Sequence, residues 1–314
     1  MQKSEFHRLS KHIGYIHNST NTGVFEADGS LYVVDTANTD EDGMLVLELT
    51  GREYPGRKLA AILHTHGHSD HTGGDTYLRE QTGCELWAPP VESVFIEHPE
   101  LVSDLYWGGR QFQDLSRHTY RAQKPCHVDR HLEAGMELSF GAVSLRCIPL
   151  PGHFYDQTGI LVRDTEDGMS AFFLGDAFFG TSIIRRYWIP FMQDQELFRT
   201  SVETIENTEA DFYLPAHGDI CPKEKVHALA EINMLITLET EGLILSLLRK
   251  KKLTAEELIK EVADFAGINM KLSQIILIGT TLRSYLSSLY NRKLIAYTVE
   301  ENRLLWYADS KALQ

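Results

Sequence analysis

Short apolar runs alternate with polar turns through the first two thirds of the chain, and long helical periodicity replaces them near residue 222. Runs of this kind bounded by Gly, Pro, Asn or Asp predict β-strands. We expect strands at 12–17, 23–27, 31–36, 59–63, 85–88, 136–140, 143–148, 159–162, 171–174 and 212–214, and helices at 42–54, 75–82 and 194–206. The order predicts a layered α+β domain whose polar clusters lie at strand ends.

The C-terminal part has a different pattern, because apolar residues recur there at helical spacing. Periodic stretches at 226–248, from 254, and at 273–290 predict three helices. Thr254 and Glu257 have the spacing of a capping box at the start of the second helix. Strand-like runs at 294–299 and 303–307 then predict a hairpin. We therefore expect a catalytic domain over residues 1–222 and a smaller helical domain, similar to a winged helix-turn-helix, over residues 223–314.

Residues 90–131 follow neither period and are rich in aromatic and basic side chains, among them Trp107. A segment this long between two strands indicates a helical insertion or a lid. We expect a helical insertion that covers the active site, with surface decoration as the alternative and Trp107 as a candidate substrate contact.

The composition is that of a folded protein, with 43% apolar and 24% charged residues. The net charge of −14 arises before residue 225, since residues 225–314 hold 12 basic and 10 acidic residues. Residues 1–224 are therefore strongly acidic, and they are poorly suited to binding a nucleic-acid backbone. The four cysteines have no Cys-x-x-Cys spacing, and neither a signal peptide nor an apolar run of about 18 residues is seen. We expect a cytoplasmic protein with no membrane segment.

The densest polar cluster directly follows the run at 59–63. It reads Thr65-His66-Gly67-His68-Ser69-Asp70-His71 and places four potential ligands within six residues. Imidazoles and a carboxylate crowded this tightly favour a cation between them, because they would otherwise desolvate one another. Three more candidates follow later strand ends, at His153, Asp176 and His217. Seven ligands are too many for one tetrahedral ion and suit two. His64, at the end of the strand, is expected to be structural.

Thr-His-x-His-x-Asp-His with downstream Gly-His, Gly-Asp and His-Gly resembles the metallo-β-lactamase superfamily, and most closely its glyoxalase II-like hydrolases. The resemblance implies a four-layer αββα sandwich. It also implies that His66, His68 and His153 bind one metal, that Asp70, His71 and His217 bind the other, and that Asp176 bridges them. Two Zn²⁺ ions are the first choice, although Fe and Mn also suit nitrogen and oxygen donors.

This resemblance predicts a dinuclear metallo-hydrolase that uses a metal-bridging hydroxide on a small ester, thioester or lactone. Asp70 would also orient the nucleophile or carry a proton. No cysteine stands in a ligand position, so we do not expect β-lactam hydrolysis. One alternative is an RNA or DNA phosphodiesterase whose C-terminal module binds nucleic acid. Another is an iron-dependent persulfide dioxygenase, which shares much of the motif.

Candidate substrate residues flank the ligands. Tyr155 follows His153 by two positions and could donate to an oxyanion, with simple packing as the alternative. Arg185 and Arg186 follow Asp176 and suit an anionic substrate, with an interdomain salt bridge as the alternative. The helix at 273–290 carries Arg283 as its single basic residue. We therefore expect the C-terminal module to serve in packing, homodimerisation or closure of the substrate pocket, and favour these roles over nucleic-acid binding.

Overall fold

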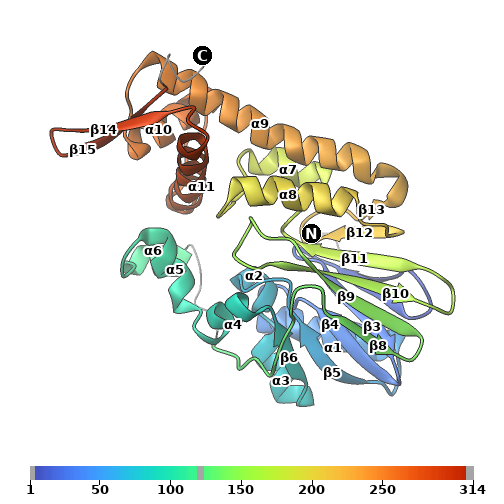
Figure 1. Ribbon diagram of the computed structural model, residues 1–314. Helices are drawn as coiled ribbons and strands as arrows, with labels where there is room; N and C mark the ends of the chain where they lie inside the picture. Colours follow the sequence, from blue (N-terminus) through green and yellow to red (C-terminus); the bar gives the residue numbers. More distant parts are fainter. Residues whose placement is uncertain (1–3, 119–123, 309–314) are drawn as a thin grey trace.

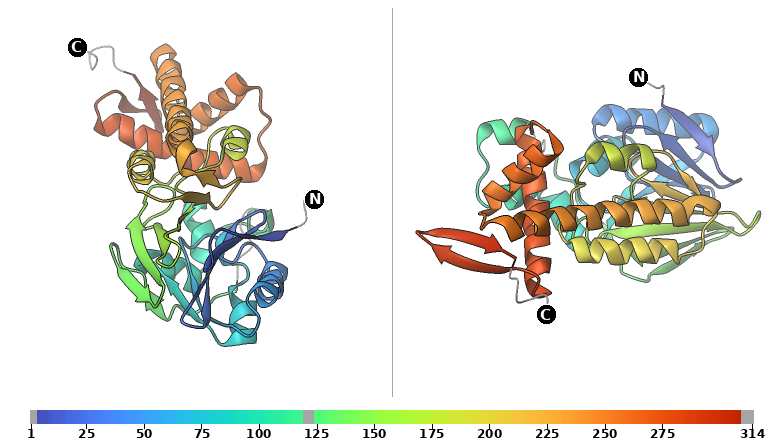
Figure 2. Two further views of the ribbon diagram at one scale, coloured as in Figure 1. Left: turned by 90° about the vertical axis from the view of Figure 1, so that its right-hand side faces the viewer. Right: turned by 90° about the horizontal axis from the view of Figure 1, so that it is seen from above.

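The computed structural model describes residues 4–118 and 124–308 and contains two β-sheets that pack face to face (Figures 1 and 2). The first sheet has its strands in sequence order: β1 (Glu5–Arg8), β2 (Ile13–His17), β3 (Thr22–Ala27), β4 (Ser30–Val34), β5 (Lys58–Leu63), β6 (Glu85–Ala88) and β7 (Arg130–His131). β1 to β4 pair antiparallel, and β4 to β7 pair parallel.

The second sheet has the order β13-β12-β11-β10-β9-β8. Its strands are β8 (Glu137–Phe140), β9 (Val143–Pro149), β10 (Thr158–Asp164), β11 (Ser170–Gly175), β12 (Phe212–Pro215) and β13 (Cys221–Pro222). β11 and β12 pair parallel, whereas the other described pairs are antiparallel. The parallel pair brings the C-terminal ends of β11 and β12 to the same edge.

Successive side chains of a strand point to opposite faces of its sheet, so each strand contributes to two layers of packing. Ile160 and Phe173 pack between the two sheets, whereas their neighbours Leu161 and Phe172 pack against helices on the far side. The outer face of the first sheet is covered by α1 (Asp40–Glu53) and α3 (Asp75–Thr82). The outer face of the second sheet is covered by α7 (Thr181–Tyr187), α8 (Gln195–Glu206) and the start of α9 (Val226–Lys250). The expected αββα sandwich is therefore confirmed.

The helix α9 belongs to both parts of the molecule. Val226 and Leu229 near its start join the cluster on the second sheet, whereas Ile244 and Leu248 near its end pack with α10 (Ala255–Ala266) and α11 (Leu272–Asn291). A hairpin of β14 (Ala296–Glu300) and β15 (Arg303–Tyr307) follows at the outer end (Figure 1). These helices and the hairpin occur in the expected order, and their likeness to a winged helix stays a prediction.

The capping box expected at α10 is present. Thr254 Oγ1 accepts a hydrogen bond from Glu257 N at 3.1 Å, and Glu257 Oε2 accepts one from Thr254 N at 2.8 Å. The last residues before α9 form a short 3₁₀ turn, Lys223–Lys225.

The segment 90–131 folds as α4 (Pro90–Glu97), α5 (Glu100–Trp107) and α6 (Gln113–His118) before it returns to the first sheet as β7, and its residues 119–123 lie outside the described part. Phe95 and Tyr106 from this segment form a buried cluster with Phe154, against which Phe191 and Leu277 pack. The cluster joins the insertion to α11. We call residues 90–131 the insertion from here on.

The elements that the pattern did not predict are mostly very short. β7 and β13 have two residues each, too few to show a period, and α7 has Ile184 as its buried residue. β1 has no fully buried residue, so it lacks the alternation that marks a strand. Among the helices that the structure describes, none is both long and apolar enough to span a membrane.

Candidate metal centre

The histidine-rich motif lies between the end of β5 and the short helix α2 (Ser69–Thr72). Backbone hydrogen bonds fasten it to the segment after β4, from Thr36 N to the His71 carbonyl and from Gly73 N to the Ala37 carbonyl, both at 2.7 Å. A Cβ at Gly73 would lie 2.0 Å from the carbonyl carbon of Asn38, so this approach requires glycine. The ends of β4 and β5 are thereby held together at the site.

The remaining ligand candidates come from the second sheet. His153 lies in the turn between β9 and β10, and Asp176 and His217 follow β11 and β12. Gly152 allows that turn to pack on α8, because its φ is +121° and a Cβ there would lie 2.1 Å from Phe198 N. Each sheet therefore contributes ligands to one shared edge.

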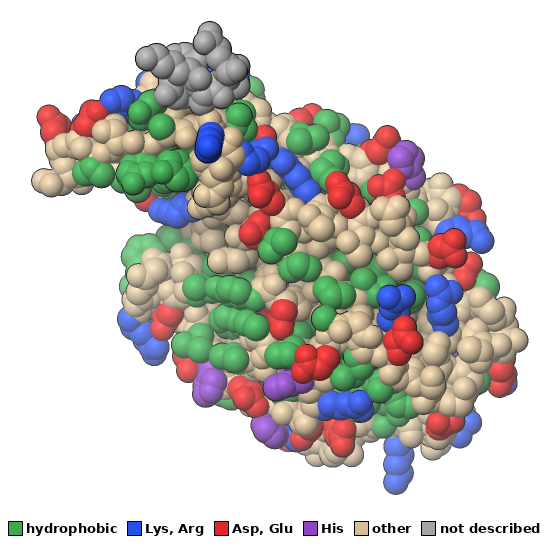
Figure 3. Space-filling model, in the orientation of Figure 1, with side chains coloured by type: hydrophobic (Ala, Val, Ile, Leu, Met, Phe, Trp, Pro, Cys, Tyr) green, Lys and Arg blue, Asp and Glu red, His purple; other side chains and the backbone are tan. Residues whose placement is uncertain are grey.

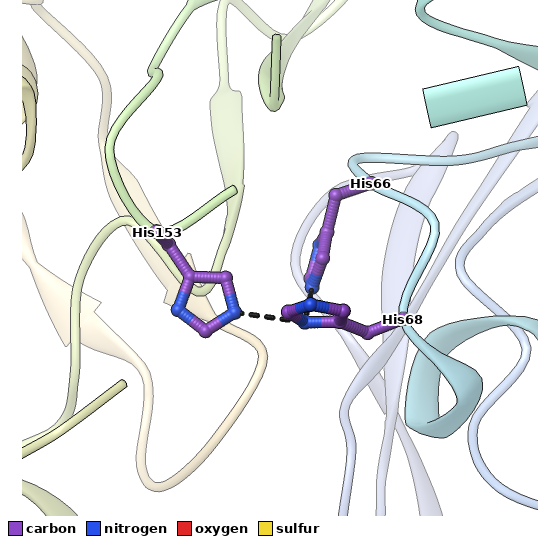
Figure 4. A group of neighbouring side chains, drawn as sticks. All are labelled: His66, His68 and His153. Carbon is purple, nitrogen blue, oxygen red and sulfur yellow. Dashed lines mark hydrogen bonds between the residues drawn. The ribbon is translucent and has the colours of Figure 1, made fainter. Parts of the chain in front are cut away.

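His66, His68 and His153 form the first group (Figure 4). Nδ1 of His68 lies 3.0 Å from Nε2 of His66 and 2.9 Å from Nε2 of His153. All three rings are buried. Ligand atoms of a tetrahedral zinc, each about 2.0–2.1 Å from the ion, are separated by about 3.3 Å, so the three nitrogens are placed to share one cation.

Asp70, His71, Asp176 and His217 form the second group. Nε2 of His217 lies 3.2 Å from Asp70 Oδ2 and 3.5 Å from Asp176 Oδ2, and Nε2 of His71 lies 3.6 Å from Asp176 Oδ1. Asp176 Oδ2 is also 3.5 Å from Nε2 of His153. One carboxylate oxygen therefore faces both groups.

Two atoms of the second group support a cation there. Nε2 of His71 and Oδ1 of Asp176 are buried and have no hydrogen-bond partner. Buried polar atoms nearly always have a hydrogen-bond partner, so two such atoms that face one another without partners indicate a ligand between them. A divalent cation would satisfy both.

The second ring nitrogen of every ligand histidine also has a partner, which fixes the ring orientation as in protein metal sites. The partners are Thr65 Oγ1 for His66 at 3.0 Å, Tyr106 Oη for His68 at 2.6 Å, Asp35 Oδ2 for His71 at 2.9 Å, the Phe191 carbonyl for His153 at 3.0 Å and the Ser19 carbonyl for His217 at 2.8 Å.

Asp35 is a central residue that the sequence analysis missed. Its Oδ1 accepts a hydrogen bond from Thr65 N at 2.9 Å, and its Oδ2 accepts bonds from Thr65 Oγ1 at 2.8 Å and from His71 Nδ1. Asp35 is buried and has a left-handed φ of 59°, which is uncommon outside glycine. It directly follows a buried strand, as Asp176 does, and that position was the available signal.

His64 takes the structural position that we expected. Its Nε2 lies 3.0 Å from Asp75 Oδ2 and its Nδ1 lies 3.4 Å from Asp35 Oδ1. It therefore supports Asp35 and does not face the metal groups.

The two groups differ in their electrostatics. Burial, together with the neighbouring imidazoles, lowers the pKa of His66 and of His68 well below the usual value. Burial would also lower the pKa of His71, but Asp35, Asp70 and Asp176 raise it to about 10. Burial would raise the pKa of Asp176, but the surrounding histidines hold it well below its usual range. The first group therefore offers neutral nitrogen donors, and the second contains ionised carboxylates.

A cavity of about 500 Å³ opens beside the ligands. Asp70, His153, Asp176 and His217 line its floor, and Arg186 and Tyr187 of α7 line one side. α11 contributes Gln274, Leu277 and Ile278 to the lining. The C-terminal region thus takes part in enclosing the pocket.

The structure separates the predicted substrate residues. Of these, Arg186 lines the cavity, and Arg185 is absent from its described lining. Trp107 lies in a separate groove between α5 and α11. Tyr155 is absent from the described lining of the cavity, and its ring stacks on Phe95 with centroids 5.5 Å apart, which is the packing that we gave as the alternative to an oxyanion contact. Tyr187, which directly follows the arginine pair, lines the cavity, and its ring centroid lies 6.2 Å from that of His217.

Comparison with known proteins agrees with this geometry. The family model of the metallo-beta-lactamase superfamily matches residues 16–217. The solved structure of a beta-lactamase domain protein from Burkholderia ambifaria superimposes with a TM-score of 0.74 at 15% identity, over 97% of this chain and 93% of that one.

Two curated proteins are distantly similar in sequence. An atrochrysone carboxyl ACP thioesterase from Passalora fulva is 22% identical over 254 residues, which are 79% of this chain and 64% of that protein. A hydroxyacylglutathione hydrolase from Hyphomonas neptunium is 26% identical over 121 residues, 38% of this chain and 34% of that protein. The chain thus spans less than two thirds of the length of either relative.

The family match covers most of the sandwich and every candidate ligand from His66 to His217, and the fold is the one that the resemblance of the motifs implied. On this evidence the chain belongs to the metallo-beta-lactamase superfamily.

Proposed function

We propose that this protein is a dinuclear metal-dependent hydrolase of a small thioester or ester. The observation that carries the proposal is the position of Asp176 Oδ2, 3.5 Å from a histidine nitrogen of each group. A single carboxylate shared by two ligand groups is the arrangement needed to hold two cations close together, where it offsets their repulsion. Zn²⁺ is our first choice for both, with Fe and Mn also compatible with the donors.

Two divalent cations at this site would lower the pKa of water held between them and polarise the substrate carbonyl. The residues of the chain supply the rest. The Asp70 side chain is 36% exposed whereas that of His71 is fully buried, so Asp70 reaches the cavity and is placed to orient the attacking water and hold its proton. Tyr187 stands beside His217 and is placed to donate a hydrogen bond to a substrate oxygen.

The cavity wall supports an acyl substrate. Phe179, Phe191, Leu277 and Ile278 give it an apolar lining, and Arg186 adds a cation. This combination suits an apolar acyl group that carries a carboxylate or another anion. The names of the two relatives, a thioesterase and a hydroxyacylglutathione hydrolase, support cleavage of a thioester, near the glyoxalase II-like branch.

The charge distribution gives less support to a nuclease. Arg283 of α11 is paired with Glu256 at 2.6 Å, and Lys251 with Glu261 at 2.6 Å. On the face shown in Figure 3, basic and acidic side chains are interspersed and form no single basic patch. Such paired cations have weak attraction for a phosphate backbone.

A substrate panel with metal analysis tests the proposal. We expect protein purified without added metal to contain about two divalent ions per chain, as a two-metal site requires. It should cleave an acyl thioester, and a chelator should abolish that activity until Zn²⁺ is restored. Cleavage of RNA in preference to thioesters, or oxidation of a persulfide by a single bound iron, would replace our proposal with one of the two alternatives.

The role of Arg186 can be tested by Arg186→Ala. Loss of a charge-assisted hydrogen bond costs about 1.5–3 kcal/mol, so KM for an acyl thioester with a terminal carboxylate should rise about 10- to 100-fold. KM for the neutral analogue should stay the same. Arg185→Ala removes the same charge from the same helix outside the cavity lining and is the matched control. Equal effects of the two substitutions would contradict a specific contact.

A further inference from the structure

The insertion contacts the first metal group directly, and the C-terminal region reaches it through the loop between α7 and α8. The ring nitrogens of His71 and His217 that face away from the second group contact Asp35 and the Ser19 carbonyl, and we call such contacts outer partners. Both outer partners lie in loops of the first sheet. In the first group, by contrast, His68 contacts the insertion, and His153 contacts the loop between α7 and α8. This difference suggests that the two groups depend on different parts of the fold.

Tyr106 of α5 makes the contact from the insertion. Its Oη lies 2.6 Å from Nε2 of His68, and the residue is 8% exposed. Nδ1 of His68 faces His66 and His153, so a cation bound at Nδ1 would leave the ring proton on Nε2, from which it would donate to the phenol oxygen. The Tyr106 ring is held by Phe191, with centroids 4.8 Å apart. Tyr106 is therefore placed to hold both the orientation and the tautomer of His68.

The loop between α7 and α8 makes the contact with His153. The Phe191 carbonyl accepts a hydrogen bond from His153 Nδ1 at 3.0 Å, and Gln193 N donates to the His153 carbonyl at 3.2 Å. The next residue, Asp194, donates from its backbone N to the Gly152 carbonyl at 2.9 Å. The loop thus holds the ring and the backbone of this ligand together.

Side chains of α11 fasten this loop in turn. Thr281 Oγ1 accepts a hydrogen bond from Met192 N at 3.1 Å, and Ser284 Oγ accepts one from Gln195 N at 3.0 Å. Thr281 is fully buried. A path of hydrogen bonds and one peptide unit therefore runs from Thr281 through Phe191 to His153.

We propose that Tyr106 and Thr281 are positioning residues for the first metal group, so that the insertion and the C-terminal region raise the affinity of that ion and leave the affinity of the second unchanged. The inference rests on the proposed dinuclear site. Loss of an outer partner of a metal ligand typically weakens metal binding about 10- to 100-fold.

The test is titration of the metal-free full chain with Zn²⁺ in competition with a chromophoric chelator, for wild type, Tyr106→Phe and Thr281→Val. We expect one of the two ions to bind about 10- to 100-fold more weakly in both variants, with the affinity of the other ion unchanged. Co²⁺ in place of Zn²⁺ provides a second readout, since the visible spectrum should change at the weakened site alone.

Matched controls separate positioning from general stability. Thr280→Val removes a neighbouring hydroxyl that bonds the Ile276 carbonyl of its own helix, and Tyr213→Phe removes a buried phenol that bonds the Thr208 carbonyl. Both should bind two ions as wild type does. Thr281→Ser keeps the hydroxyl and should restore the affinity that Thr281→Val loses.

The outcomes are distinguishable. If the wild type itself binds no pair of ions, the proposed dinuclear site fails. If the wild type binds two ions and both variants match it, or if both ions weaken equally in the variants, the positioning roles are overturned. Tyr106→Phe deletes one oxygen atom and keeps the ring packing, so it decides the question even where Thr281→Val does not fold.

Discussion

Asp176→Asn should lower the metal content toward about one ion per chain and should strongly reduce thioester cleavage. The reduction should exceed the factor of about 10 to 100 that is typical when a metal ligand loses its supporting hydrogen-bond partner. The asparagine has the same shape but no charge. Its one oxygen can take the position of Oδ2, which lies 3.5 Å from both His153 and His217, or that of Oδ1, which lies 3.6 Å from His71, but not both. Without the charge, nothing at this position offsets the repulsion between two cations.

The measurement is metal content by elemental analysis together with kcat/KM on one acyl thioester. Asp219→Asn is a matched control, because Asp219 is exposed, follows His217 by two positions and belongs to neither ligand group. It should keep both ions and full activity. An Asp176→Asn protein that retains two ions with wild-type affinity would show that this carboxylate does not join the groups.

Asp35→Asn should weaken Zn²⁺ binding about 10- to 100-fold although Asp35 belongs to neither ligand group. Oδ2 of Asp35 accepts hydrogen bonds from His71 Nδ1 and from Thr65 Oγ1, and Thr65 Oγ1 in turn contacts Nδ1 of His66. The carboxylate therefore orients one ligand of each group. Burial would raise the pKa of Asp35, but His71 and His64 lower it to about 2, so the charge that is lost is present at neutral pH.

Competition with a chelator would measure this effect, with thermal unfolding of the metal-free protein as the check on folding. Asp164→Asn is the control for loss of a buried carboxylate, since Asp164 is 1% exposed and accepts a hydrogen bond from Ser10 at 2.8 Å. Asp164 is the last residue of β10, whereas the His153 turn precedes the first residue of that strand. It should lower stability and leave the affinity for Zn²⁺ unchanged. Equal losses of affinity in both variants would assign the effect to destabilisation.

Much of the architecture could be predicted because it depends on local patterns. The continuous apolar runs at 159–162 and 171–174 reflect strands that are buried on both faces, and the structure places Leu161 and Phe172 on one face and Ile160 and Phe173 on the other. The capping box at Thr254 was equally local. Two-residue strands such as β7 carry no period and were missed.

The candidate ligands were predictable for a related reason. His66, His68, Asp70 and His71 are neighbours in sequence, so their density alone indicates a cation. His153, Asp176 and His217 could be added because strand ends in a layered fold meet at one edge. The structure brings these seven residues into two groups, as the family resemblance implied.

The sequence by itself thus determined a layered α+β fold and the seven candidate ligands, because these follow from periodicity and from ligand spacing, and its resemblance to a known family implied the two ligand groups and the reaction class. Only the tertiary structure decided which residues support and surround the ligands. Asp35, Tyr106 and Thr281 are separated from their partners by many residues, and Tyr187 rather than Tyr155 reaches the cavity. The packing of the insertion and of α11 against the sandwich positions Tyr106 and Thr281, whereas contacts within the sandwich position Asp35 and Tyr187. These are contacts between segments far apart in sequence, so local periodicity does not encode them.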